Sequence, residues 1–307
     1  MKVKVKNHSK ICLVISGTIM LVALVMSIMG YGINYGLDFD GGLNIKYQMN
    51  SEFDNADIEA ALHNQNINEF KISKAGADQT ELQLRIRDIS DEDVQVFRTK
   101  LEDELLKKYR DMDIKNAAVA YVGPVAGATL IKNAFLSVAI ASLLMLIYIG
   151  FRFDLNSGVA AVFGLVHDVL IMVSFMVIFR SFIQMNSTFI AAMLTIVGYS
   201  INNTIVIFDR IRENNRKPGF SSIDKNEIVN ISISESLGRT INTTLTTLFT
   251  IVALYVFGVD AIKEFALPII IGILSGVYSA NMINGYVWAY LTKTKFLTKK
   301  NKKPQRA

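Results

Sequence analysis

Six long apolar stretches, separated by polar segments, run along the chain. They lie at 11–29, 132–151, 157–179, 187–208, 240–257 and 265–291. A helix needs about 20 predominantly apolar residues to cross the hydrocarbon of a bilayer, and each stretch is near or above that length. The pattern therefore predicts a membrane bundle, all α-helical, of six transmembrane helices.

The segment between the first two stretches has a shorter period. Alternation of apolar and polar residues predicts four strands, at 43–49, 70–73, 81–87 and 114–122. A helical pattern begins near Asp54 or Asn55, and another begins at Ser90, with Asp93 three residues on as in a capping box. The order β-α-β-β-α-β predicts a ferredoxin-like α+β domain.

The stretch 198–214, GYSINNTIVIFDRIREN, places polar side chains inside a predicted span. Asn202 and Asn203 are adjacent amides within it. Hydrocarbon offers no hydrogen-bond partner, and each unsatisfied polar group there costs several kcal/mol. We therefore expect both amides to face protein.

Helical spacing places further polar residues on one face of each of two spans. In the fourth span these are Thr195, Tyr199, Asn202 and Asp209. In the fifth they are Thr243, Thr246, Thr247 and Thr250. Two such faces can satisfy each other through interhelical hydrogen bonds, or they can line a hydrated path.

Asp168 lies near the middle of the third predicted span, beside His167. An ionisable group at that depth indicates a functional site, with a partner expected nearby. The alternative is a neutral or hydrogen-bonded Asp168 that serves packing. Adjacent helical residues point about 100° apart, so we do not expect His167 and Asp168 to form a side-by-side pair.

The sixth span carries small residues four apart, Gly272 with Gly276 and Ser275 with Ser279. This spacing allows helix backbones to approach closely, so the span is expected to pack against its neighbours. Pro268, early in the span, predicts a local kink.

The connection between the fourth and fifth spans contains a turn signal at 217–219, Lys-Pro-Gly. Residues 224–235 follow with a helical pattern. Its apolar face, with Ile228 and Ile231, predicts a short helix lying along the membrane surface.

Composition and charge agree with a membrane protein and orient it. The chain is 51% hydrophobic, and residues 36–122 hold 18 acidic and 11 basic side chains. The remaining short loops and tails are basic, and the positive-inside rule then places both termini in the cytoplasm and the 34–125 domain outside. A domain of net negative charge lacks the basic surface that phosphate binding requires, so nucleic acid is not an expected partner.

No pattern of hydrolytic chemistry is present. The sequence has no GxxxxGK[ST] and no HExxH, and its three histidines, His8, His63 and His167, are scattered. Its one cysteine, Cys12, allows no internal disulfide. We therefore expect no enzymatic activity, no cofactor and no metal.

The segment GLDFDGG (36–42) follows the first span. Gly36, Gly41 and Gly42 predict a tight turn from a membrane helix into an edge strand. Counted from Asp38, a calcium loop would need a glutamate at position 49, where the chain has Met49. A calcium site is therefore not expected.

Four motifs in this order resemble the SecF family, accessory subunits of the bacterial Sec protein translocase. They are GLDFDGG (36–42), LVHDVLIM (165–172), GYSINNTIVIFDRIREN (198–214) and ESLGRTINTT (235–244). The residues that carry the resemblance are Gly36, Asp38, Phe39, Gly41, Gly42, His167, Gly198, Asp209, Arg210, Arg212, Glu213 and Glu235.

The resemblance implies half of a transporter of the resistance-nodulation-division type. Such a half works with a SecD-like subunit, assists the SecYEG channel and the motor SecA, and uses an ion gradient to move an unfolded polypeptide across a bacterial cell membrane. The family usually has an aspartate at the position of Asn203, and an amide cannot titrate. This half's own proton relay is therefore in doubt.

Arg239, at the mouth of the fifth span, has two interpretations. It holds a relay carboxylate ionised, as the resemblance implies, or it extends to lipid headgroups. The alternatives for the whole chain are a structural translocon subunit that is not coupled to ions, and a lipid or drug exporter of the same superfamily.

The predicted organisation has four parts. They are a cytoplasmic N-terminus with the first span at 1–33, the extracytoplasmic domain at 34–125, spans two to six at 126–292 with a cytoplasmic loop at 209–238, and a basic cytoplasmic tail at 293–307.

Overall fold

The computed structural model describes residues 5–75, 80–87, 89–90, 93–181, 183–220 and 222–294. Nearly all of the predicted basic tail, residues 295–307, lies outside the described residues. The chain forms two compact units, Tyr35–Ala134 and the combination of Met1–Asn34 with Phe135–Ala307. Each unit is described separately below.

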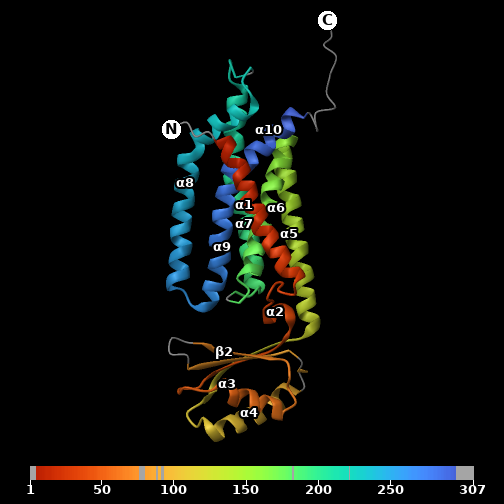
Figure 1. Ribbon diagram of the computed structural model, residues 1–307, viewed down its shortest axis with the longest axis vertical. Coiled ribbons are helices and arrows are strands. Elements are labelled where there is room, and N and C mark those ends of the chain that lie inside the picture. Colours follow the sequence, from red (N-terminus) through yellow and green to blue (C-terminus); the bar gives the residue numbers. More distant parts are fainter. Residues whose placement is uncertain are drawn as a thin grey trace. The chain divides into compact units, whose positions relative to one another are not determined.

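The six predicted spans are present as long helices (Figure 1). The first five are α1 (Val5–Ile28), α5 (Pro124–Arg152), α6 (Leu155–Ile178), α7 (Ser187–Arg216) and α8 (Lys225–Phe257). The sixth consists of α9 (Asp260–Ser279), η2 (Ala280–Asn284) and α10 (Gly285–Lys293). All six are long and apolar enough to cross a membrane.

Burial separates the helices of the bundle into an inner and an outer group. Half or more of the apolar part of α6, of α7 and of the sixth span is buried, against 11% or less for α1, α5 and α8. The protein-lined interior of the bundle, where a polar functional site would be enclosed, therefore lies between α6, α7 and α9.

The sixth span departs from α-helical geometry at a place that the sequence did not indicate. Pro268 lies inside α9, which continues to Ser279, and a π-helical segment, η2, follows at Ala280–Asn284. A π-helical turn shifts the register of the residues on either side and often occurs at functional sites. Here the segment carries two buried amides, Asn281 and Asn284.

The separate surface helix predicted at 224–235 is not formed, and this prediction was wrong. Those residues begin α8, a single helix of 33 residues that starts after the N-cap Asp224. Ile228 is fully buried in an apolar cluster with residues of α7 and α10. The apolar face packs on the bundle, and nothing in this sequence breaks the helix before the membrane part of α8. Of the described residues in the predicted loop 209–238, only 217–220 and 222–224 are not helical.

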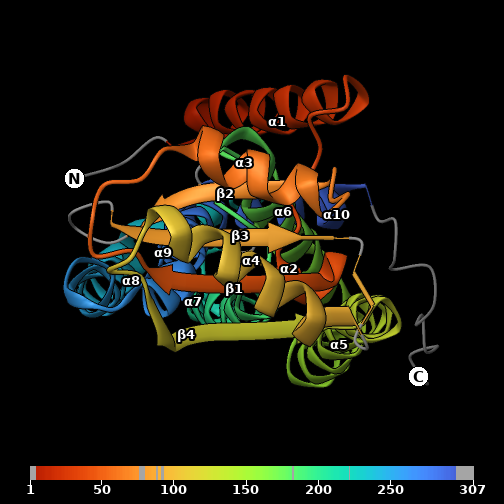
Figure 2. The ribbon, with the colours of Figure 1, turned by 90° about the horizontal axis from the view of Figure 1, so that it is seen from below.

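The second unit contains the four predicted strands, β1 (Gly42–Gln48), β2 (Phe70–Ala75), β3 (Glu81–Ile86) and β4 (Asp113–Val122). They pair antiparallel in the order β2-β3-β1-β4 (Figure 2). The helices α3 (Asn55–Asn64) and α4 (Val94–Lys108) follow β1 and β3 in the chain, and α2 (Leu37–Asp40) precedes β1.

The core of this unit follows the period-two pattern of the strands. Leu43 and Ile45 on β1 and Leu84 on β3 are fully buried, and Ile45 lies directly opposite Leu84. They pack in one cluster with residues of both helices, including Ile58 and Leu101. The alternation in the sequence thus identified the buried face correctly.

The helix starts agree with the sequence in one case and differ in the other. Asp54 caps α3, its carboxylate accepting from the Ala56 amide. The capping box expected from Ser90 is not present, because α4 begins at Val94 and the Ser90 hydroxyl donates to the Asp93 carboxylate, 2.6 Å away.

The turn at 36–42 contains a single helical turn, α2, before the chain enters β1. Gly41 and Gly42 have φ angles of 74° and 107°, which side-chain-bearing residues rarely adopt. A Cβ at Gly42 would also collide with the Ile86 carbonyl oxygen. Gly41 and Gly42 therefore form the predicted tight turn, and Gly36 has no such φ angle. The strand that follows is not the predicted edge strand, because β1 pairs with β3 on one side and with β4 on the other.

Candidate functional site

Asp168 is the most enclosed ionisable residue of the predicted site, with none of its surface exposed. It lies on α6 and accepts hydrogen bonds from three serine hydroxyls, Ser200 on α7 at 2.5 Å and Ser275 and Ser279 on α9 at 2.7 and 2.9 Å. A buried carboxylate is tolerated only when donors satisfy its oxygens, and the serines provide them. Asp168 therefore joins α6, α7 and α9.

The small residues of α9 make this arrangement possible. A Cβ at Gly276 would lie 3.4 Å from Ser200 Cα and 3.6 Å from Asp168 Oδ2. The predicted close approach of the sixth span is thus present, against α7 and α6. The sequence showed Ser275 and Ser279 as small residues, but it gave no sign that their hydroxyls would meet a carboxylate.

His167 contacts Asp168 directly, so the expectation that the two would not pair was wrong. His167 Nδ1 lies 3.0 Å from Asp168 Oδ1. The directions of adjacent helical residues diverge by about 100° at Cβ, but both side chains are buried, and the imidazole is long enough to reach a neighbouring carboxylate.

The other ring nitrogen of His167 connects the pair to α1. His167 Nε2 lies 2.8 Å from Ser16 Oγ, which lies 2.9 Å from the Tyr278 hydroxyl. The Tyr278 hydroxyl donates to the Cys12 carbonyl. A continuous polar chain therefore runs from Asp168 through His167, Ser16 and Tyr278 to the backbone of α1.

The number of protons in this hydrogen-bonded chain of side chains determines whether it can take up another one. It has four links, between Asp168 and His167, His167 and Ser16, Ser16 and Tyr278, and Tyr278 and the Cys12 carbonyl. A neutral imidazole and two hydroxyls supply one proton each, which leaves one link without a proton. One further proton on the His167–Asp168 pair completes every link. The arrangement can therefore hold an exchangeable proton inside the bundle.

The two adjacent amides are placed differently from each other. Asn203 is buried, at 2% exposure, and its amide nitrogen has no partner among the described residues. Asn202 is exposed on the surface of this chain. The expectation that both amides face protein is met within this chain by Asn203. For Asn202 it stays a prediction, because adjacent positions on a helix point about 100° apart and this one faces away from the bundle.

A second polar cluster lies around the π-helical segment. Asn284 donates from its amide nitrogen to the Thr204 hydroxyl, 2.9 Å away, and its amide oxygen has no partner among the described residues. Gly164 on α6 leaves the room that the Asn284 side chain occupies, since a Cβ there would collide with it. The sequence placed Asn284 in a span but gave no sign of this contact.

The predicted polar faces of the fourth and fifth spans do not bond each other among the described contacts, and the hydrogen bond that joins the two spans reaches Thr244, outside the predicted threonine face. The Tyr199 hydroxyl donates to Thr244 Oγ1, 3.2 Å away. Thr243 and Thr246 are exposed, and the Thr246 hydroxyl donates to the Thr243 carbonyl of its own helix. Most of the threonine face is therefore left on the surface of this chain.

Arg239 is also exposed, on α8. It forms no hydrogen bond or ion pair with another residue that the structure describes. Its two predicted roles, as the partner of a relay carboxylate or as a headgroup ligand, both stay predictions.

Three charged residues of the fourth-span motif and the following motif come together where α7 and α8 meet. Arg210 contacts Glu235 at 2.6 Å and Glu213 at 2.5 Å. Asn214, which is fully buried, donates to both Glu235 and Ser232. The sequence did not single out Asn214. These contacts fix the ends of the two helices to each other.

The remaining motif residues are scattered. Gly198 and Asp209 are exposed on α7, and the Arg212 side chain donates to the Arg152 carbonyl, 3.1 Å away. In the second unit, Phe39 is buried, Asp40 pairs with Arg87 at 2.6 Å, and Asp38 also has an interaction partner. The motif residues of the two units are thus not parts of one cluster.

Within the described ranges, no group of three or more histidine, cysteine, aspartate and glutamate side chains is arranged to hold a metal ion.

Comparisons with known proteins give one consistent result. Residues 102–294 match the family described as "Protein export membrane protein SecD/SecF, C-terminal". The chain is 35% identical over 270 residues to the protein translocase subunit SecF of Endomicrobium trichonymphae, covering 86% of this chain and 83% of that protein.

Two longer relatives are named SecDF. The chain is 34% identical over 270 residues to the protein translocase subunit SecDF of Bacillus subtilis, covering 87% of this chain and 35% of that protein. The crystal structure of SecDF, a translocon-associated membrane protein from Thermus thermophilus, superimposes with a TM-score of 0.77 at 30% identity. That match covers 94% of this chain and 38% of the other.

Proposed function

The chain belongs to the SecD/SecF family of protein export membrane proteins, and on this basis we propose that it works in the Sec translocase beside a SecD-like subunit. It is a multi-pass bacterial membrane protein of protein transport. The proposal adds a partner, an orientation and a coupling ion to that assignment. It assigns no enzymatic activity to the chain.

The SecD-like partner is supported by the longer relatives and by the surface of the bundle. In the SecDF proteins of Bacillus subtilis and Thermus thermophilus, the matched region is only a little over a third of the chain. In this chain, Asn202 on α7 and Thr243 and Arg239 on α8 are exposed polar residues within long apolar helices. Lipid tails cannot satisfy such groups, and a second helical subunit can.

The proposed orientation places both termini in the cytoplasm and the unit Tyr35–Ala134 outside. It rests on the excess of lysine and arginine in the short loops and tails on one side. The outer unit is assigned to the ferredoxin-like class on its β-α-β-β-α-β order and its antiparallel strand order β2-β3-β1-β4. In this orientation, it is the part available to an emerging polypeptide.

The proposed ion is the proton, and its carrier in this chain is the His167–Asp168 pair. The observation that supports this is the fully buried Asp168 carboxyl, joined to His167, Ser16 and Tyr278 by links that one additional proton completes. Asn203, at the position where the family usually has an aspartate, cannot fill this role. SecYEG and SecA are the further partners that the function requires.

Co-purification tests the partner. The tagged protein, extracted in a mild detergent, is expected to bring down the SecD-like protein and the SecYEG channel. A pure homo-oligomer that retains neither would instead support the exporter of lipids or drugs.

Export in membrane vesicles tests the coupling. With SecA and ATP held constant, a proton gradient is expected to increase export only in vesicles that contain this subunit and its partner. Equal export with and without the gradient, with the complex intact, would leave the protein a structural subunit of the translocon.

A further inference from the structure

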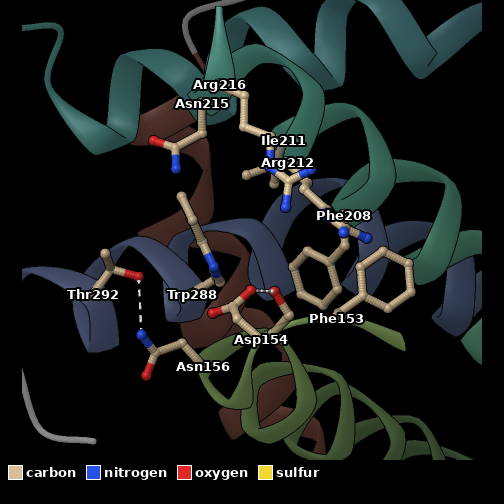
Figure 3. A pocket seen from close by; sticks show the side chains of 11 residues that line it. Phe153, Asp154, Asn156, Phe208, Ile211, Arg212, Asn215, Arg216, Trp288 and Thr292 are labelled. Carbon is tan, nitrogen blue, oxygen red and sulfur yellow. Dashed lines mark hydrogen bonds between the residues drawn. The ribbon is translucent and has the colours of Figure 1, made fainter. Parts of the chain in front are cut away.

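A cavity of about 370 Å³ opens between α6, α7, α10 and the connection that leads from α5 to α6 (Figure 3). Its wall includes Asp154 and Asn156 at the start of α6, Arg212 and Arg216 at the end of α7, and Trp288 on α10. It shares no residue with the network around Asp168. Arg212 belongs to the motif 198–214, but the proposed function gives this cavity no role.

Two residues of this wall each carry a buried polar atom that has no partner among the described residues. The indole N–H of Trp288 is an unpaired donor on a side chain that is 4% exposed. The amide oxygen of Asn156 is an unpaired acceptor on a residue that is 7% exposed, while its amide nitrogen donates to Thr292. Leaving such groups unpaired costs free energy, so their presence together indicates a ligand with one acceptor and one donor.

The charged groups around the cavity also include both kinds of hydrogen-bonding partner, donors on two arginines and acceptors on one aspartate. Arg212 and Arg216 supply guanidinium groups, and only one Arg212 nitrogen, Nη1, has a protein partner in the described residues, the Arg152 carbonyl. Asp154 supplies a carboxylate, of which Oδ1 accepts from Ser157 at 2.5 Å and Oδ2 has no described donor. Guanidinium groups with an indole N–H suit a phosphate, and a carboxylate with an amide oxygen suits an ammonium group.

We propose that this cavity binds the phosphoethanolamine headgroup of a membrane phospholipid. The phosphate lies against Arg212, Arg216 and the Trp288 N–H, and the ammonium group lies against Asp154 and the Asn156 oxygen. A choline headgroup has no N–H to donate to Asn156, and a glycerol headgroup has no positive charge for Asp154.

The position of the cavity along the helices supports a lipid as the source of this headgroup. The candidate spans α5 and α6 end and begin at Arg152 and Leu155, on either side of Asp154. The cavity therefore lies at the level where the chain leaves the hydrocarbon, which is where headgroups are located. Exposed Phe151 and Leu155 flank the same connection and provide apolar surface for acyl chains.

Trp288 is the only tryptophan of the chain, so its fluorescence reports on this cavity directly. The intact protein, purified in detergent, is titrated with dihexanoyl phosphatidylethanolamine, phosphatidylglycerol and phosphatidylcholine, and with soluble phosphoethanolamine. Phosphatidylethanolamine is expected to change the emission saturably, with a half-saturating concentration about tenfold lower than that of the other two lipids. The difference is expected because its ammonium group adds one or two charge-assisted hydrogen bonds.

Two variants separate the halves of the headgroup. Arg212→Gln is expected to weaken the binding of all three lipids by about tenfold, because each lipid carries a phosphate. Asp154→Asn keeps an acceptor for Ser157 and is expected to weaken only the binding of phosphatidylethanolamine. This lipid would then bind no more tightly than phosphatidylglycerol. Arg152→Gln removes a charge from the same end of the bundle. Its guanidinium lies over the ring of Phe153 in the cavity wall but gives the cavity no polar group, so this variant is expected to bind the lipids as the unmodified protein does.

Equal responses to the three lipids, or responses that neither variant changes, would leave the cavity to ordered water and overturn the proposal. Saturation by soluble phosphoethanolamine without any response to the lipids would overturn the lipid source. A loss of lipid selectivity in Arg152→Gln as large as in Asp154→Asn would also contradict the proposal, since it would show a general effect of charge.

Discussion

The surroundings of Asp168 are polar but contain few charges. Three serine hydroxyls and the His167 ring surround its two oxygens at 2.5 to 3.0 Å, and none of these four contacts is made by a lysine or an arginine. Hydroxyls can donate to an ionised carboxylate and can also accept from a protonated one, so the site accommodates both states by rotating O–H bonds. This adaptability distinguishes it from a fixed ion pair.

Ser16→Ala tests the link between this site and α1. The substitution leaves His167 Nε2 and the Tyr278 hydroxyl without their common partner. We expect a loss of about 1–3 kcal/mol in the free energy of unfolding, measured by chemical denaturation in mixed micelles.

Thr18→Ala, on the same helix, is the control for that measurement. Its hydroxyl is exposed and donates to a carbonyl of its own helix, so the change is expected to stay within about 0.5 kcal/mol. An equally small effect of Ser16→Ala would show that the link through Ser16 contributes nothing to the fold.

Asn203→Asp restores a titratable group at the position where the family usually has one. The aspartate has nearly the same shape and removes a buried amide nitrogen that has no described partner. We expect normal membrane insertion and a greater dependence of export on the proton gradient, measured in vesicles. Asn203→Ala, which removes the same amide without adding a titratable group, is the control and is expected to leave the gradient dependence unchanged. A protein that fails to insert would contradict the interpretation that position 203 lies in a protein-lined site.

At the scale of elements, the close approach of α9 and α7 holds the site together. A Cβ at Gly272 would collide with Ile196 of α7, and Gly276, one turn on, lies against Ser200. Because α9 carries two of the three serines around Asp168, any separation of these helices removes donors from the carboxylate.

Gly272→Leu is expected to force that separation. Overpacking of a well-packed interface costs about 1–3 kcal/mol, so the denaturation midpoint in mixed micelles falls, and the gradient-dependent part of export falls with it. Gly17→Leu is the matched control, since no other atom lies within 4 Å of the added Cβ at this exposed position. Equal stability of the two variants would contradict the assigned packing.

In the unit Tyr35–Ala134, an ion pair connects the beginning of α3 with the end of α4. Lys108 and the Tyr109 hydroxyl donate to the two oxygens of Asp57, at 2.5 Å each, and these hydrogen bonds hold the pKa of Asp57 below its ordinary value of 3.8. A carboxyl whose pKa is lower in the folded state stabilises the fold above its unfolded pKa, and this stability is lost as the pH falls through the folded pKa.

Residues 35–123 enclose their own core and can be measured as a separate fragment. The free energy of unfolding of this fragment is therefore expected to decrease as the pH is lowered from about 5 to below the folded pKa of Asp57. Thermal unfolding followed by circular dichroism measures it. Asp57→Asn is expected to make the curve flatter over this range and to lower stability at neutral pH. A curve for Asp57→Asn parallel to that of the unmodified protein would show that other carboxyls cause the dependence.

For the whole molecule, the sequence predicted those features that arise from local patterns. Six apolar lengths gave the spans, and alternation gave the buried face of β1 and β3, because burial of an element imposes its own period on the chain. The charged start of α8 resembled a separate surface helix, since the polarity of residues 224–235 does not show that they pack on α7 and α10.

The candidate site could be predicted only in part, for a related reason. Asp168 is conspicuous as a carboxyl in an apolar span, whereas the serines that bond it come from α7 and α9, and the partner of His167 comes from α1, all distant in the chain. Serines four residues apart indicate close helix packing, but this spacing does not show whether their hydroxyls donate to a carboxylate on another helix or to carbonyls of their own helix. The pairing of His167 depends on the direction of a ring, which sequence spacing does not contain.

The measurement that tests the central claim most directly is gradient-driven export in vesicles that carry Asp168→Asn, beside the control Ser174→Ala. Ser174 is buried on the same helix and donates to a carbonyl of that helix. With SecA and ATP constant and the SecD-like partner present, we predict that Asp168→Asn keeps basal export and loses most of its stimulation by the proton gradient, while Ser174→Ala keeps both. Undiminished stimulation in Asp168→Asn would contradict the assignment of the proton to the His167–Asp168 pair.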